Sequence, residues 1–82
     1  MIENRLIEIR KENKVTQTQL ADAVLTTRQT IYLIEKGKVV PSLELAMKIA
    51  IFFNRSIEDI FSLKSKNQKI DLKIEEDLFK IF

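Results

Sequence analysis

Apolar residues recur at helical spacing in the first half of the chain. Leu20, Ala21 and Val24 fall at i, i+1 and i+4, and Ile31 and Ile34 lie three residues apart. Each set therefore lies on one side of an amphipathic helix. The pattern predicts two short helices with a tight break between them.

The polar residues beside these sets indicate where the two helices begin and end. Thr16 precedes Gln19 by three residues, which is the spacing of a capping box, and Thr27 stands directly before Arg28. Gly37 follows the second apolar set, and glycine takes the left-handed conformation after a helix at the least cost. We expect helices to begin after the two threonines and the second helix to end at the glycine.

A third amphipathic stretch covers residues 42–53, where a proline and then a serine cap precede the helix. We expect its buried side to consist of Leu43, Ala46, Ile49, Ala50 and Phe53. Ile51 and Phe52 fall outside that side, so the helix carries more apolar surface than one-sided packing needs. We assign these two residues to a dimer contact, although single exposed apolar residues are also common.

The C-terminal part of the chain divides into two segments of different composition. Residues 62–69 have the composition of a linker, and residues 70–82 are again rich in apolar residues. The spacing in this last segment fits a strand, a helix, or a strand followed by a helix. Leu78, Phe79 and Phe82 would promote aggregation if they were exposed to water. The segment is therefore expected to pack on its own domain, a second subunit or another protein.

The helix expected over residues 28–36 has a chemically varied outer face. At about 100° per residue, Gln29, Tyr32, Leu33 and Lys36 point away from the buried isoleucines, and Arg28 lies at the edge of this arc. Glutamine can pair with adenine and arginine with guanine, and a leucine can touch a thymine methyl group. The face is therefore a candidate for reading DNA, with an ordinary solvated helix face as the alternative.

Composition narrows the function further. The 82 residues include no histidine, no cysteine and one glycine. The chain thus lacks the usual neutral-pH acid–base group, thiol nucleophile, zinc ligands and glycine-rich phosphate loop, so we expect no enzyme, no metal and no cofactor. Its net charge of +2 is too small to identify a nucleic-acid partner. Without a signal peptide or a spanning apolar run, the protein is expected in the cytoplasm and not in a membrane.

Several local motifs occur together in one order. They are Arg10-Lys11, Thr16-Gln17, Arg28-Gln29-Thr30-Ile31, Ile34-Glu35-Lys36-Gly37-Lys38, Pro41-Ser42-Leu43 and Ser56-Ile57-Glu58-Asp59-Ile60-Phe61. Through them, residues 4–61 resemble the Cro/CI type of helix-turn-helix regulators, the XRE family, and among its small members the dimeric cytolysin-type repressors. The resemblance implies an all-α, five-helix bundle of the lambda-repressor type over residues 1–61. Residues 62–69 would link it to a short C-terminal extension of strand, helix or both, residues 70–82, for dimerisation or partner binding.

The resemblance also implies roles for individual residues. Arg28, Gln29 and Leu33 would contact bases, and Arg10 would form an ion pair with Glu35. Gln17 and Lys38 would contact the DNA backbone. Beyond the resemblance, Thr27, Thr30, Tyr32 and Lys36 are further candidates for DNA contacts, although Tyr32 could equally pack on the neighbouring helix. Family members usually carry glycine and then an apolar residue in the turn, where this chain has Leu25 and Thr26. A leucine at positive φ costs on the order of 1 kcal/mol, so we expect a reshaped turn.

Taken together, these features predict a sequence-specific DNA-binding transcriptional regulator, a repressor acting as a homodimer on a two-fold symmetric operator. An antitoxin-type regulator whose tail binds a cognate toxin is the alternative. A protein-binding module without DNA affinity is a third reading, because a fold does not fix a function.

Overall fold

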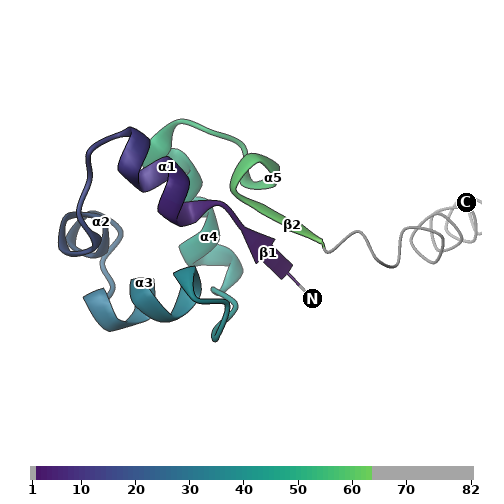
Figure 1. Ribbon diagram of the computed structural model, residues 1–82, viewed down its shortest axis with the longest axis horizontal. Coiled ribbons are helices and arrows are strands. Elements are labelled where there is room, and N and C mark those ends of the chain that lie inside the picture. Colours follow the sequence, from purple (N-terminus) through teal and green to yellow (C-terminus); the bar gives the residue numbers. More distant parts are fainter. Residues whose placement is uncertain (1, 64–82) are drawn as a thin grey trace, which may run out of the picture.

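The computed structural model describes residues 2–63 of the chain. The described elements are β1 (Ile2–Asn4), α1 (Leu6–Glu12), α2 (Gln17–Ala23), α3 (Arg28–Glu35), α4 (Leu43–Phe53), α5 (Ile57–Ile60) and β2 (Phe61–Leu63). Figure 1 shows the helices gathered around one centre, with the two strands at the end away from α2. The expected five-helix bundle is confirmed over this part of the chain.

The predicted helix ends are also confirmed. The Thr16 hydroxyl accepts from the Gln19 backbone N–H at 3.0 Å, and the Gln19 side chain accepts from the Thr16 N–H at 2.9 Å. The Thr27 hydroxyl accepts from the Thr30 N–H at 3.1 Å. Gly37 has φ of +73° just beyond α3. These interactions satisfy backbone groups that the helices themselves leave free.

The turn between α2 and α3 keeps the left-handed conformation, so the expectation of a reshaped turn was wrong. Leu25 has φ of +59° although it is not glycine. The Thr26 N–H donates to the Ala21 carbonyl at 2.9 Å and closes the end of α2. Since the Leu25 side chain is 82% exposed, no packing penalty adds to the backbone strain of about 1–2 kcal/mol.

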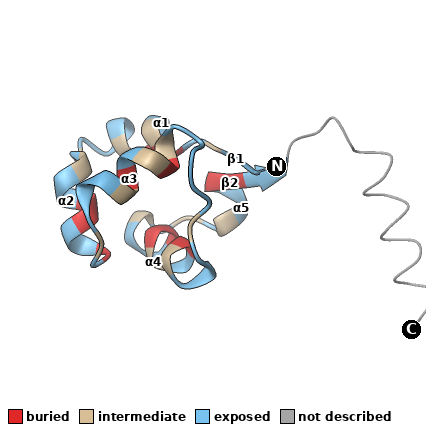
Figure 2. Cartoon of the chain, turned by 90° about the horizontal axis from the view of Figure 1, so that it is seen from below, coloured by how far each residue is buried: buried red, intermediate tan, exposed pale blue. Residues whose placement is uncertain are grey.

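The core lies where the helices face one another, as the buried residues in Figure 2 show. Its fully buried large side chains are Leu6, Ile9, Leu20, Ile31, Ile34, Ile49 and Ile60. The core residues expected from α2 and α3 are buried, as are Ala46 and Ala50 of α4, while Phe53 is partly buried. Leu43 was wrongly assigned to the core, because it is 72% exposed at the first turn of α4, where it lies over a surface groove.

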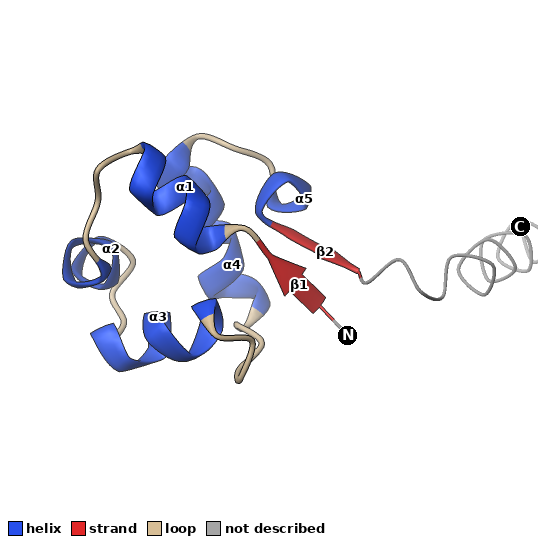
Figure 3. Ribbon diagram, in the orientation of Figure 1, coloured by secondary structure: helices blue, strands red, loops and turns tan. Residues whose placement is uncertain are grey.

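A small sheet joins the two ends of the bundle, and the sequence pattern did not predict it. β1 and β2 pair antiparallel, with Ile2 opposite Leu63 and Asn4 opposite Phe61 (Figure 3). Next to the sheet, the Arg5 N–H donates to the Ile60 carbonyl at 2.9 Å. The family resemblance implies a fifth helix over the Ser56–Phe61 motif, but α5 ends at Ile60 and Phe61 instead begins β2. No helix in the described part of the chain is long and apolar enough to cross a membrane.

Candidate nucleic-acid interface

The outer face of α3 is open to solvent over most of its length. Arg28, Gln29 and Tyr32 are exposed, and Leu33 is partly exposed. Within residues 2–63, neither the Arg28 guanidinium nor the Gln29 amide makes a hydrogen bond to another side chain. The first turn of α3 therefore presents donors and acceptors that are free to meet an external partner.

The threonines at the start of α3 already have local partners. The Thr27 and Thr30 hydroxyls lie 2.9 Å apart, and Thr27 also caps the helix. A hydroxyl can both donate and accept, so one contact to a phosphate remains compatible with this geometry. The pair fixes the orientation of the helix start beside Arg28.

Side chains from α1, α2 and α3 meet at a nearly buried carboxylate. Arg10 Nε lies 2.7 Å from Glu35 Oε2, and Arg10 Nη2 lies 3.3 Å from Glu35 Oε1. Gln17 Nε2 donates to the same Oε1 at 2.9 Å. The Glu35 side chain is only 2% exposed and that of Arg10 13%. This network holds α3 against the first two helices, so its role is positioning.

Gln17 takes part in that network rather than standing free. Its amide nitrogen carries two N–H groups, and the Glu35 carboxylate accepts from the nitrogen at 2.9 Å. A second N–H is left to donate to a phosphate, the contact that the family resemblance implies. The sequence did not indicate the bond to Glu35, because Gln17 and Glu35 are 18 residues apart.

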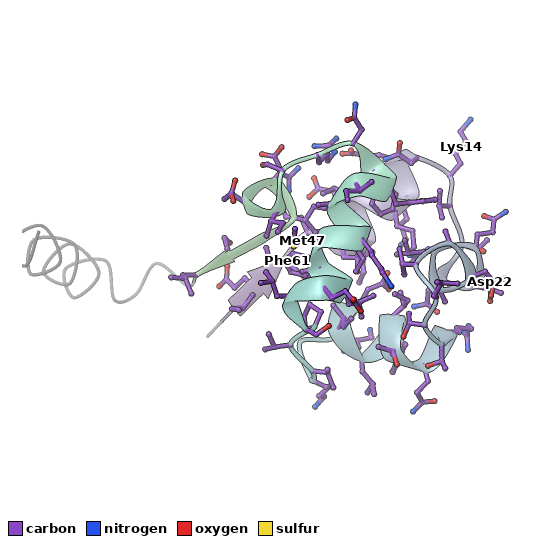
Figure 4. The ribbon with its side chains drawn as sticks, turned by 180° about the vertical axis from the view of Figure 1, so that it is seen from behind. Lys14, Asp22, Met47 and Phe61 are labelled. Carbon is purple, nitrogen blue, oxygen red and sulfur yellow. The ribbon has the colours of Figure 1, made fainter. Side chains whose placement is uncertain are left out.

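A basic hollow of about 540 Å³ lies beside the start of α3. Its lining includes Lys11, Lys14, Thr16, Thr18 and Arg28. Figure 4 shows Lys14 pointing away from the domain, from the connection between α1 and α2. Arg10 also lines the hollow and is paired with Glu35, but among the ion pairs formed within residues 2–63 none involves Lys11, Lys14 or Arg28. Their charge is therefore available to an anionic partner of the size of a phosphate backbone.

The end of α3 carries two further cations and the only tyrosine of the chain. Lys36 Nζ lies 5.7 Å from the centre of the Tyr32 ring, within the range of a cation–π contact. The Lys38 N–H donates to the Leu33 carbonyl at 2.9 Å, which fixes the chain just after the helix. Lys36 and Lys38 are both exposed. Positive charge thus lies at both ends of the exposed face of α3.

The residues assigned to a dimer or partner contact lie elsewhere. Ile51 is 76% exposed and Phe52 41% exposed on α4, where they line a hollow of about 300 Å³ together with Ala23 and Leu25. Leu78, Phe79 and Phe82, and the rest of the extension over residues 70–82, lie outside the described residues.

Three contributors to this interface were not assigned a site role from the sequence. Lys11 and Lys14 line the basic hollow together with Arg28; the sequence indicated only that their charge belongs to the part of the chain expected to face DNA. Asn4 donates from Nδ2 to the Ile34 carbonyl at 2.9 Å and so ties β1 to α3. No local signal could have revealed that contact, which joins residues 30 positions apart.

The chain is similar to known proteins over most of its length. The helix-turn-helix family model matches residues 6–60. An uncharacterized HTH-type transcriptional regulator of Archaeoglobus fulgidus is 53% identical over 57 residues, which are 70% of this chain and 80% of the relative. A protein of the same description from Methanocaldococcus jannaschii is 52% identical over 60 residues, 73% of this chain and 91% of the relative. The corresponding regulator YgzD of Bacillus subtilis is 42% identical over 66 residues, 80% of this chain and all of the relative.

Proposed function

This chain belongs to the helix-turn-helix family of the Cro/CI (XRE) type, and from that membership we propose that it regulates transcription as a sequence-specific repressor. The matched relatives are named as HTH-type transcriptional regulators. Family membership makes the chain a DNA-binding regulator rather than an enzyme. We propose in addition that the protein represses transcription, that it binds a two-fold symmetric operator and that it acts as a dimer.

The observation that carries the proposal is the free outer face of α3 beside a basic hollow. Arg28 belongs to both surfaces, because it opens α3 and lines the hollow. With α3 in the major groove, Arg28, Gln29 and Leu33 contact base edges. Lys11 and Lys14 then neutralise phosphates next to that groove and supply attraction that does not depend on sequence.

Two copies of the chain are proposed to act together on DNA. α4 exposes Leu43, Met47 and Ile51 at intervals of four residues, with exposed fractions of 72%, 48% and 76%. Residues spaced in this way form one stripe along a helix. Burial of the stripe's C-terminal end, Ile51 with Phe52, between two copies would remove this surface from water. A symmetric pair of α3 helices about 34 Å apart would then read a two-fold symmetric operator.

The experiment that tests the proposal is selection of bound sites from random duplex DNA by the purified protein at about 150 mM salt, where much of the non-specific attraction is screened. We expect an inverted repeat whose half-sites lie one helical turn apart. The Gln29→Ala variant should change the bases enriched at one position of each half-site. Glu58→Ala, a change at an exposed residue of α5, serves as the control and should select the wild-type sequence.

Failure to enrich any sequence would contradict the proposal, and enrichment of a single half-site would contradict the dimer alone. The antitoxin alternative depends on residues 70–82, which lie outside the described residues. No contact within residues 2–63 favours it, so we propose the operator-binding regulator.

A further inference from the structure

An apolar groove lies between the start of α4, α5 and the strands. It has a volume of about 270 Å³, and its lining includes Ile2, Val40, Leu43, Ala46, Ile57 and Phe61. Ala46 and Phe61 are buried at its floor, whereas Val40 and Leu43 are 61% and 72% exposed. Single exposed apolar residues are ordinary, but a hollow lined throughout by apolar residues indicates a surface that a partner covers.

The chemistry of the groove narrows the kind of partner. Its volume lies at the small end of the range of about 300–1,000 Å³ that is typical of small-molecule sites. All of its lining residues are apolar, since the remaining one is Pro41. A small ligand would find no polar group to orient it, whereas apolar side chains of a polypeptide need none. The groove is therefore suited to a short apolar stretch of chain.

Such a stretch begins close by in the same molecule. Phe61 of β2 lines the groove, and Leu63 of β2 lines an adjoining hollow of about 180 Å³ together with Ile57 and Phe61. The chain thus leaves the described part beside the groove. Residues 64–69 are polar and residues 70–82 contain seven large apolar residues, which are Ile70, Leu72, Ile74, Leu78, Phe79, Ile81 and Phe82.

Chain length allows these apolar residues to reach the groove. Six extended residues span at most about 20 Å, so residues 64–69 are long enough for the chain to turn back over β2. The match to the helix-turn-helix family ends at residue 60, and 66 residues account for the whole Bacillus subtilis relative. The family fold therefore does not require residues 70–82, which leaves this segment free to serve as an addition to the domain.

We propose that residues 70–82 dock in this groove of their own chain through their apolar side chains. Because only six residues join this segment to β2, its effective concentration at the groove is on the order of millimolar. At micromolar protein concentration, the groove therefore meets the segment of its own chain at a higher concentration than the same segment of a second copy. Docking covers Leu43 and Val40, and it leaves Ile51 and Phe52 available for a contact between copies.

Paramagnetic broadening of amide signals tests the proposal on the full-length chain. The protein has no cysteine, so Lys80→Cys provides one attachment point for a nitroxide label within the apolar segment. We expect strong loss of peak intensity at Ala46 and Ile57 in the groove. The amides of Thr18 and Ala23 on α2, at the end of the bundle away from the strands, should keep their intensity (Figure 1).

A mixed sample separates docking within one chain from docking between copies. Protein that carries the nitroxide but no isotope label is mixed with isotope-labelled protein that carries no nitroxide. The broadening at Ala46 should disappear in this sample if the segment docks in its own chain. Its persistence would assign the groove to a second copy and overturn the proposal. Weak, uniform broadening, or broadening centred on Leu25 and Ile51, would overturn it as well.

Leu43→Asp provides the matched variant. Because Leu43 is 72% exposed, the change removes apolar groove surface without opening the core. We expect the broadening at Ala46 to fall to the level at Thr18. A Val39→Asp control makes the same kind of change at a residue that is 41% exposed and outside the groove lining, and should retain the broadening. Equal effects of the two variants would contradict docking at this groove.

Discussion

Removal of Arg10 from the network around Glu35 should destabilise the domain far more than removal of an arginine from an exposed pair. Glu35 accepts from Arg10 at 2.7 and 3.3 Å and from Gln17 at 2.9 Å. In Arg10→Met, a carboxylate that is 2% exposed would keep only the Gln17 bond. A buried charge left without its partner costs about 3–5 kcal/mol, a large part of the 5–15 kcal/mol that is usual for a domain.

Urea unfolding followed by far-ultraviolet circular dichroism measures this loss. The measurement is made as a double-mutant cycle with Arg10→Met, Glu35→Leu and the variant that carries both changes. We expect the double variant to lose less free energy of unfolding than Arg10→Met alone, because apolar replacement of both partners removes the buried charges together. The sum of the two single losses should therefore exceed the loss in the double variant by more than the roughly 0.5 kcal/mol scatter of independent sites.

The Arg55–Glu12 pair supplies the control. Its atoms lie 3.3 Å apart and its side chains are 34% and 48% exposed, so Arg55→Met should cost less than about 1 kcal/mol. A similarly small loss for Arg10→Met would refute the argument, as would additive single losses. Arg10→Met should also preserve the preferred DNA sequence under conditions where it is folded, because Arg10 positions α3 through Glu35 and is not one of the proposed base-contacting residues.

Four further variants address the turn, the two kinds of DNA contact and the dimer. Leu25→Gly should raise the free energy of unfolding by about 1 kcal/mol in urea, because glycine relieves the strain at positive φ; a loss would show that the leucine makes stabilising contacts. Gln29→Ala should weaken operator binding by about 1–3 kcal/mol with non-specific binding nearly unchanged, and equal weakening in titrations of both DNAs would remove its base-reading role. Lys38→Ala should weaken binding to all sequences and make the salt dependence shallower, so a changed base preference would contradict a phosphate contact. Ile51→Glu should be monomeric in sedimentation at micromolar concentration, whereas a persistent dimer would move the interface elsewhere.

Much of the bundle could be predicted because its signals are local. Thr16 and Thr27 each bond an N–H three residues ahead, and Gly37 takes its own left-handed conformation. These interactions depend on neighbours within one turn of helix. The apolar spacing likewise identified Ile31 and Ile34, which are fully buried, since helical periodicity alone decides which residues share a face.

The expectations that failed are those in which contacts with other parts of the chain decide against a local preference or pattern. At Leu25, the local preference against positive φ is small enough for the bonds that end α2 to overcome it. At Leu43, helical spacing indicated a buried face, but the helix begins beyond the part of the core that could cover its first turn. Periodicity gives the direction of a side chain and not the extent of the partner surface.

The sequence by itself determined the order of the helices, their caps and the arc of α3 that carries Arg28 and Gln29. Only the tertiary structure decided that Gln17 bonds Glu35, that Asn4 ties β1 to α3, and that Lys11 and Lys14 share a hollow with the start of α3. The difference is one of range along the chain. The interactions that form a helix join residues three and four apart, so they can be predicted from the local sequence. A contact across 18 or 30 residues forms only after the core has brought its partners together.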